Sequence, residues 1–158
     1  MAAIAASLAA PLAVSLARIV AAAPAGADWW LIGSVAAKLS GINVEPQDVD
    51  VLASTATIEA IADNLGGGVS QGNRNERFRS RPFCRVTVEH GLDIELMGDL
   101  EVCRSGIWQP LVVTSRVAVE IAAGTVYVPL LGEQVRIFEL FGRPKDLAKA
   151  ELIKSHLP

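Results

Sequence analysis

Four carboxylates in two pairs are the residues of this sequence best suited to chemistry. Asp48 and Asp50 are separated by one residue, as are Asp93 and Glu95 further along the chain. On a strand, side chains two positions apart lie on one face, about 6–7 Å from each other. Two carboxylates at that spacing, completed by a third from a neighbouring strand, form an all-oxygen cage suited to two Mg²⁺ ions. Such a cage supports phosphoryl chemistry.

A Gly33-Ser34 turn ahead of the first carboxylate pair offers a complementary anion site. It lies between an expected strand, 29–32, and an expected short helix, 35–39. Glycine lets a triphosphate approach the backbone, the Ser34 hydroxyl can donate to a phosphate oxygen, and helix N-termini attract anions. Taken alone, a Gly-Ser pair is an ordinary helix cap and an Asp-x-Asp an ordinary solvated strand end. The order of the two features along the chain favours the chemical interpretation.

Arginine is concentrated between residues 74 and 85, beside a glycine-rich segment. The five are Arg74, Arg77, Arg79, Arg81 and Arg85. One hypothesis is a solubilising surface loop. The other places Arg79 or Arg81 against a triphosphate or an acidic acceptor, because the guanidinium fork matches phosphate oxygens.

These side chains must be positioned by strands and helices that alternate along the chain. Apolar alternation and turn residues predict strands at 29–32, 48–52, 83–88, 92–97, 100–103, 107–113 and 125–128. Helices are expected at 35–39, 54–65 and 145–156, while 116–122 fits either a strand or a short helix. The strands between 83 and 113 are expected to form one antiparallel meander, and the polar stretch 66–81 a loop. The fold class is therefore α+β, with a mixed β-sheet backed by helices.

The Ala-rich N-terminus, 1–25, is expected to be a helix docked on the core. Four apolar residues recur at helical spacing and form one stripe: Leu8, Leu12, Leu16 and Ile19. The alternative is a signal peptide cut at 25–27. A signal peptide begins with a basic region, however, and the first cation here is Arg18. Mass spectrometry of the native N-terminus separates the two.

Length and composition bound the class of protein. The chain has 158 residues, 51% hydrophobic, with a net charge of −3. Because about 150 residues is the usual size of a domain, we expect a single domain over 1–158 that closes with a helix at 143–157. The charge balance argues against a dedicated nucleic-acid binder, and the Ala-rich N-terminal run is too weakly apolar for a membrane span. Two cysteines and two histidines are too few for a disulfide scaffold or a Cys/His zinc site, which favours a reducing, cytoplasmic location.

Three blocks of the sequence resemble the nucleotidyltransferase superfamily of polymerase-β-like folds. The first, Trp29–Leu52, reads WWLIGSVAAKLSGINVEPQDVDVL and has the superfamily's Gly-Ser turn followed about a dozen residues later by Asp-x-Asp. The second, Gly91–Trp108, reads GLDIELMGDLEVCRSGIW and is similar to the third-carboxylate strand and following hairpin of small members. The third, Gly142–Ile153, reads GRPKDLAKAELI and is similar to their closing helix.

The resemblance implies roles for the carboxylates. Asp48 and Asp50 would each bind both metal ions. Asp93 or Glu95 would be the third carboxylate, since the two alternate onto one face and either can be matched. A glutamate in that role would depart from the commoner aspartate.

The resemblance also implies an activity: Mg²⁺-dependent or Mn²⁺-dependent transfer of a nucleoside monophosphate from a triphosphate such as ATP to an acceptor hydroxyl. Gly33 and Ser34 would bind the nucleotide, and Lys38 and Lys145 would be neighbours of its phosphates, unless each is an ordinary exposed lysine. The acceptor is a small molecule, a protein or an RNA end, and a partner subunit or a second copy could supply its binding surface. The alternative is a module of the same fold that binds a nucleotide or a partner without transferring anything.

Overall fold

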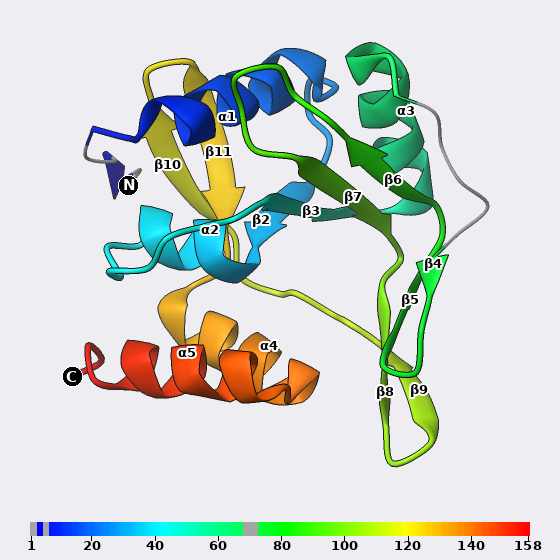
Figure 1. Cartoon of the computed structure of the whole chain (residues 1–158), viewed down its shortest axis with the longest axis vertical. Coiled ribbons are helices and arrows are strands. Elements are labelled where there is room, and N and C mark those ends of the chain that lie inside the picture. The colour runs from blue at the N-terminus through cyan, green and yellow to red at the C-terminus, as the bar shows by residue number, and fades with distance from the viewer. Residues whose placement is uncertain (1–2, 5–6, 68–72) are drawn as a thin grey trace.

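Helices and strands are interleaved along the chain in the computed structural model, which describes residues 3–4, 7–67 and 73–158 (Figure 1). Its helices are α1 (Ala10–Ala22), α2 (Gly33–Leu39), α3 (Thr55–Leu65), α4 (Leu131–Phe141) and α5 (Pro144–Lys154). Its strands are β1 (Ala3–Ile4), β2 (Trp29–Ile32), β3 (Val49–Ala53), β4 (Asn73–Arg74), β5 (Phe78–Ser80), β6 (Phe83–Val86), β7 (Ile94–Gly98), β8 (Glu101–Arg104), β9 (Ile107–Pro110), β10 (Val117–Ile121) and β11 (Gly124–Val128). The α+β class is confirmed.

A mixed sheet with the strand order β2-β3-β7-β6 lies at the centre of the molecule. β3 and β7 are parallel, while β2 and β6 pair antiparallel at the two edges. In Figure 1, α1 and α3 cover one side of this sheet, and α2, α4 and α5 lie on the other. The central strands are apolar because Val49, Val51, Ile94 and Leu96 are fully buried between these layers. The predicted mixed sheet backed by helices is confirmed.

Helix α1 is part of this core. Its predicted stripe faces inward: Leu12, Leu16 and Ile19 are buried, and Leu8 just before the helix packs against the same cluster. Pro11 lies in the first turn, where its missing N–H costs no hydrogen bond. Burial of each of these large side chains is worth about 1.5–3 kcal/mol, so α1 stabilises the sheet that it covers.

The single meander predicted for residues 83–113 is wrong. β6 pairs with β7 in the central sheet, whereas β8 and β9 join a second sheet of order β4-β5-β8-β9. The chain changes sheets at Asp99, whose φ of 44° turns the backbone sharply. The expected loop 66–81 is also wrong at β5, since Phe78 pairs with Val102 of β8; residues 68–72 of that stretch lie outside the described residues. Phe78 and Val102 pack in the same hydrophobic cluster, and this packing favours the pairing of β8 with β5 in the second sheet.

A third sheet, of order β1-β10-β11, packs beside β2 and α1 (Figure 1). Its strand β10 lies within residues 116–122, for which the sequence was compatible with either a strand or a short helix. It is a strand because Val119 and Val126, paired across β10 and β11, are both buried.

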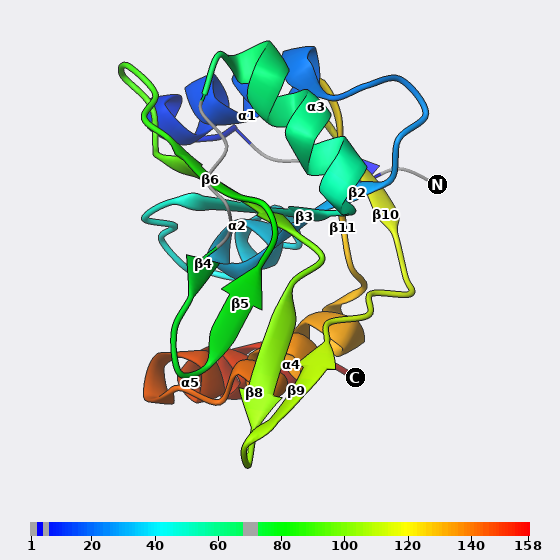
Figure 2. The same ribbon diagram turned by 90° about the vertical axis from the view of Figure 1, so that its right-hand side faces the viewer.

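Two arginines tie the second sheet to the C-terminal helices. Arg77 Nη1 donates to the carbonyl oxygen of Phe141 at 2.5 Å. Arg104 Nη1 donates to the carbonyl oxygens of Glu139 and Leu140 at 2.9 and 3.0 Å. Both therefore satisfy carbonyls at the C-terminal end of α4, where a positive charge is favourable. Figure 2 shows α4 and α5 behind the β8–β9 hairpin of this sheet.

Glu133 fixes the start of α4 to the segment that precedes β10. Its carboxylate accepts from the backbone N–H groups of Thr114 and Ser115 at 2.9 and 2.8 Å, from both hydroxyls, and from Arg136. Burial alone would raise the pKa of Glu133, but the hydrogen bonds from Ser115, Thr114 and Arg136 outweigh burial and lower the pKa to about 2.

No helix in the described part of the chain is long and apolar enough to cross a membrane.

We predict that Glu133→Gln destabilises the protein at neutral pH by on the order of 3 kcal/mol, because the charged form makes these hydrogen bonds. A lowered pKa gives stability above the ordinary value of 4.5 that is lost as pH falls towards about 2. The difference between wild type and variant should therefore shrink over that interval in urea unfolding curves. Glu151→Gln, at a 74% exposed side chain, is the control. A constant difference from pH 7 to pH 3 would contradict the assignment.

Candidate active site

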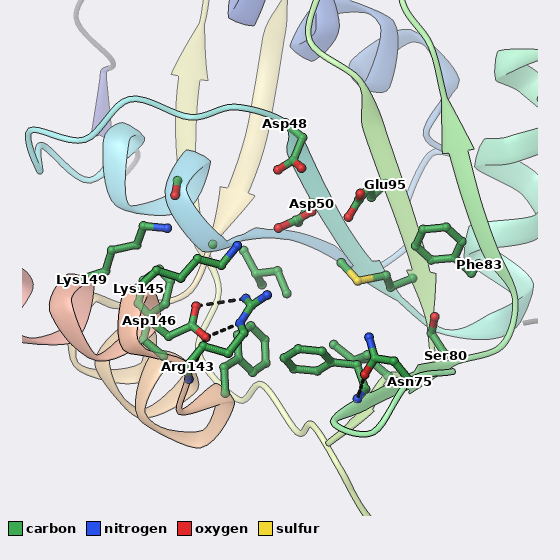
Figure 3. Close-up of a pocket in the computed structure, with 18 residues that line it drawn as sticks. Asp48, Asp50, Asn75, Ser80, Phe83, Glu95, Arg143, Lys145, Asp146 and Lys149 are labelled. Carbon is green, nitrogen blue, oxygen red and sulfur yellow. Dashed lines mark hydrogen bonds and ion pairs between the residues drawn. The ribbon is translucent and has the colours of Figure 1, made fainter. Parts of the chain in front are cut away.

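A cavity of about 340 Å³ opens between the central sheet, the second sheet and the α4–α5 pair (Figure 3). Three carboxylates, Asp48, Asp50 and Glu95, line one wall. Each offers one oxygen that lies within 4.8 Å of the other two. Of the four predicted carboxylates, the structure brings together Asp48, Asp50 and Glu95.

Strand register explains why these three carboxylates meet. β3 and β7 pair so that Asp50 lies opposite Glu95, and side chains opposite each other in a sheet point to one face. Asp48 precedes Asp50 by two positions and shares its face. The apolar residues between them point to the opposite face, into the core.

Gly33 lies beside Asp50 on the β2 side of the sheet. β2 and β3 pair with Ile32 opposite Asp50, so the chain turns into α2 beside this carboxylate. Gly33 has a φ of +73°, and a Cβ there would lie 3.0 Å from Asp50 Oδ2. Only glycine allows both the backbone angle and the close approach. Ser34 follows it and also lines the cavity.

The environment of Asp50 is unfavourable for a charged carboxylate. Among the described residues, its Oδ1 is buried without a hydrogen-bond partner. Burial raises the pKa of Asp50 well above its ordinary value, the charges of Asp48 and Glu95 raise it further, and Arg143 partly opposes them. A buried unpartnered carboxylate oxygen facing two more carboxylates fits a divalent cation, which prefers oxygen ligands. Asp48, Asp50 and Glu95 would hold it.

Cations line the opposite wall of the cavity, at the N-cap of α5 and on the helix itself. Arg143, Lys145 and Lys149 face the carboxylates in Figure 3. Arg143 is oriented by Asp146, a 1% exposed residue that accepts from its Nε at 2.6 Å and its Nη2 at 3.1 Å. The guanidinium also lies over the Phe78 ring, 5.0 Å from its centroid. An anion between the two walls would contact both a bound cation and these side chains.

Asp93 lies apart from this group. Arg85, opposite Glu95 on β6, donates to Asp93 Oδ2 from Nε at 3.2 Å and from Nη2 at 3.0 Å, and also pairs with Glu95. The guanidinium therefore holds Asp93 outside the three-carboxylate group and contacts that group through Glu95.

The structure does not bring the predicted nucleotide contacts Lys38, Arg79 and Arg81 to this cavity. Lys38 pairs with Glu45 at 3.6 Å. Arg79 makes two hydrogen bonds to Glu101, at 2.9 and 3.0 Å, and stacks on the Trp108 ring. Arg81 is exposed. The hydrogen-bonding and stacking capacity of Arg79 is thus used on the face of the second sheet.

Sequence analysis missed Arg143 and Lys149 and left Lys145 between a phosphate contact and an exposed lysine. Their position depends on how α5 packs on α2 and α4, through Ala150 and Ile153 among others. The i, i+4 spacing of Lys145 and Lys149, which places both on one face of a helix, was the available signal.

Two solved structures are similar to this chain. A candidate nucleotidyltransferase from Thermotoga maritima, TM1012, is 24% identical with a TM-score of 0.65, covering 82% of this chain and 81% of that one. The antibiotic-resistance factor ANT(2'')-Ia is 14% identical with a TM-score of 0.54, covering 92% of this chain and 83% of that one. No family model matches the chain, and no curated protein matches its sequence. The chain has a nucleotidyltransferase-like fold, in agreement with the resemblance of its three sequence blocks.

We predict that Asp50→Asn stabilises the metal-free protein at neutral pH, because it removes a buried negative charge beside Asp48 and Glu95. A raised pKa means that stability present below the ordinary value of 3.8 is lost as pH rises. The advantage of the variant should therefore grow from about pH 4 upwards. Thermal unfolding with a chelator measures it.

Mn²⁺ or Mg²⁺ should raise the melting temperature of the wild type and leave that of Asp50→Asn nearly unchanged. Asp63→Asn, at an exposed position on α3, controls for the loss of one charge. A metal-induced shift of equal size in wild type and Asp50→Asn would refute the cation site.

Proposed function

We propose that this protein transfers a nucleoside monophosphate from a nucleoside triphosphate to an acceptor hydroxyl, with Mg²⁺ or Mn²⁺. One observation carries the proposal: three carboxylates with oxygens within 4.8 Å of one another face three cationic side chains across one cavity. A metal-bound triphosphate has the charge to fill the space between such walls. The nucleotidyltransferase-like fold supports the same conclusion.

The carboxylate wall would hold the metal through Asp48, Asp50 and Glu95. A divalent cation, when bound, neutralises phosphate oxygens and lowers the pKa of a bound hydroxyl. The orphaned Oδ1 of Asp50 gives the strongest support, because a ligand to that atom would offset its desolvation.

The reaction forms one bond and breaks one. The acceptor oxygen attacks the α-phosphorus, the bond from that phosphorus to the bridging oxygen breaks, and pyrophosphate leaves with the bond's electron pair. The acceptor proton passes to a carboxylate, to which we assign Glu95, and then to solvent. The protein contributes position and charge, with no covalent intermediate.

The cationic wall would receive the leaving group. Arg143 is pre-oriented by Asp146, so its fork loses little side-chain freedom on binding a phosphate. Lys145 and Lys149 add compact positive charges one helical turn apart. The Ser34 hydroxyl supplies a further donor at the start of α2.

A non-catalytic module is the second candidate, and a specific contact favours it. Glu95 already pairs with Arg85, so the carboxylate that would complete the site is shared with a cation of the chain itself. Such a module would bind a metal-bound triphosphate through Asp48 and Asp50 and transfer nothing. The proposal also includes an acceptor, a partner subunit or second copy, and a cytoplasmic location. The last is supported by Cys84 and Cys103, neither of which is in a disulfide.

Label transfer from each of the four α-labelled triphosphates, with Mg²⁺ or Mn²⁺, tests the proposal directly. The acceptors are a mixture of small hydroxyl compounds, RNA ends and proteins, including the protein itself. Metal-dependent labelling that Asp48→Asn abolishes is the expected result. Binding of triphosphate without labelling of any acceptor would favour the module, and absence of binding would overturn both.

We predict that Glu95→Gln and Asp93→Asn separate the two candidates. Neither should alter triphosphate affinity by more than about threefold, since Asp48 and Asp50 remain. In an enzyme, Glu95→Gln should lower the transfer rate by about 100-fold or more, the scale of general acid–base catalysis. Asp93→Asn, which changes only the Arg85 contact, is the matched control. Full transfer activity in Glu95→Gln would show that Glu95 has no catalytic role.

We also predict that Gly33→Val weakens triphosphate binding much more than Ser34→Ala. A Cβ at Gly33 meets Asp50 Oδ2 at 3.0 Å and the φ of +73° is strained for valine. Removal of the Ser34 hydroxyl costs only one hydrogen bond to a charged acceptor, about 1–3 kcal/mol. Calorimetric titration measures both affinities, with circular dichroism as the check on folding. Equal triphosphate affinities of the two variants would indicate that the Gly33-Ser34 turn only caps helix α2.

A further inference from the structure

The cavity has two chemically different ends. One end holds the carboxylates and the cations of α5. The other end, towards β5 and β6, is lined by Phe83 and Met97 together with two neutral polar residues, Asn75 and Ser80, while Phe78 lies between the two ends with the Arg143 guanidinium over its ring. Figure 3 shows Phe83, Ser80 and Asn75 on the far side of Glu95 from Lys145 and Lys149. A ligand that spans the cavity must therefore be anionic at one end, and aromatic or apolar and uncharged at the other.

Asn75 presents a hydrogen-bond donor of fixed orientation. Its Oδ1 accepts from the backbone N–H groups of Arg77 and Phe78 at 2.8 and 2.7 Å. Two donors on one atom identify it as the oxygen, so the other atom is the amide nitrogen. Asn75 is exposed, Figure 3 shows that nitrogen on the opposite side of the amide from the hydrogen-bonded oxygen, and none of the described residues accepts a hydrogen bond from it. The turn thus leaves a donor at the mouth of the neutral end.

The walls around this donor suit a flat ring. Phe78 is held by an edge-to-face contact with Phe141, with ring centroids 5.0 Å apart. Met97 lies opposite Phe83 in the β6–β7 pair, so a thioether and an aromatic ring form adjacent parts of the surface. Aromatic and thioether surfaces favour stacked planar groups. A nucleobase is such a group, and it is linked to the phosphates through the ribose.

We propose that the neutral end is the nucleobase subsite, and that Asn75 Nδ2 donates to a carbonyl oxygen or ring nitrogen on the edge of the base. The inference rests on the proposed function, because it assigns the second half of the same nucleotide. Asn75 is then a specificity-determining residue. Its donor pairs with acceptor atoms of the base and rejects exocyclic amino groups, which are donors themselves.

Asn75→Asp tests the assignment with little change of structure. One carboxylate oxygen still accepts from the two backbone N–H groups, while the other replaces the donor with an acceptor. Asn75→Ser replaces the amide donor with a shorter hydroxyl that does not reach the same position and adds no charge, and serine also forms this kind of turn. Gln109→Glu, at an exposed position on β9, is the control for the added charge.

The measurement is calorimetric titration with metal and without acceptor, using the four triphosphates and inorganic tripolyphosphate as probes. The wild type should bind its preferred triphosphate at least tenfold more tightly than tripolyphosphate. Asn75→Asp and Asn75→Ser should lose about tenfold of that affinity, and the tripolyphosphate affinity should stay within about twofold. Gln109→Glu should alter neither.

Each failure has a separate meaning. If neither nucleotides nor tripolyphosphate bind with metal, the proposed function itself fails. If tripolyphosphate binds as tightly as every nucleotide, or if both variants weaken the two probes equally, the nucleobase subsite is wrong while the phosphate site stands. If the variants change only the KM of an acceptor, the neutral end belongs to the acceptor and the inference is overturned.

Discussion

The parallel pairing of β3 with β7 is the constraint on which the site depends. It places Asp50 opposite Glu95 and brings like charges together beside a buried, unpartnered oxygen. Nothing in the carboxylates themselves favours this register in the absence of a cation. It is set on the opposite face, where Val51 and Leu96 are fully buried in register with each other. A slip of one residue would exchange the two faces, so the apolar core enforces the acidic wall.

The surrounding layers supply the stability that such a site requires. Unfavourable electrostatics are concentrated at functional sites and must be offset elsewhere in a fold. Here the offset comes from the apolar face of the sheet, covered by α1 and α3, and from helix α1 in particular, whose Leu16 and Ile19 are fully buried. Helix α1 is therefore part of the hydrophobic core.

The sequence predicted the local structure well because local signals were strong. Alternating apolar residues marked β2 and β3, and the helix expected at 54–65 matches α3, where Ser54 accepts from the N–H of Thr57 at the start and Gly66, with a φ of 73°, ends the helix. Sheet membership was not readable, because β8 leaves the central sheet to pair with β5, a choice made by partners distant in sequence.

The nucleotide contacts predicted for Arg79 and Arg81 depended in the same way on residues distant in sequence, and the structure places neither residue at the cavity. A guanidinium binds whichever acceptor the tertiary fold brings to it, a glutamate for Arg79 and the carbonyl of Phe141 for Arg77. The arginine-rich segment favoured either a surface loop or a contact with a phosphate or an acidic acceptor, but the partners that the fold supplies to Arg77 and Arg79 are a backbone oxygen and an acidic side chain of this chain. The carboxylates were predictable because their spacing, unlike that of the arginines, has a fixed meaning on a strand.

The two walls of the cavity come from distant parts of the chain, and residues outside the cavity hold them together. Arg77 and Arg104 fasten α4 to the second sheet, and Glu133 fastens it to the segment before β10. The carbonyl and carboxylate contacts of these residues set the position from which α5 faces the carboxylates. A ligand that bridges both walls binds only when they are so placed, and its binding free energy adds to the stability of that arrangement. Docking of the last two helices and occupancy of the site are therefore thermodynamically linked, although no residue that fastens α4 carries any of the proposed chemistry.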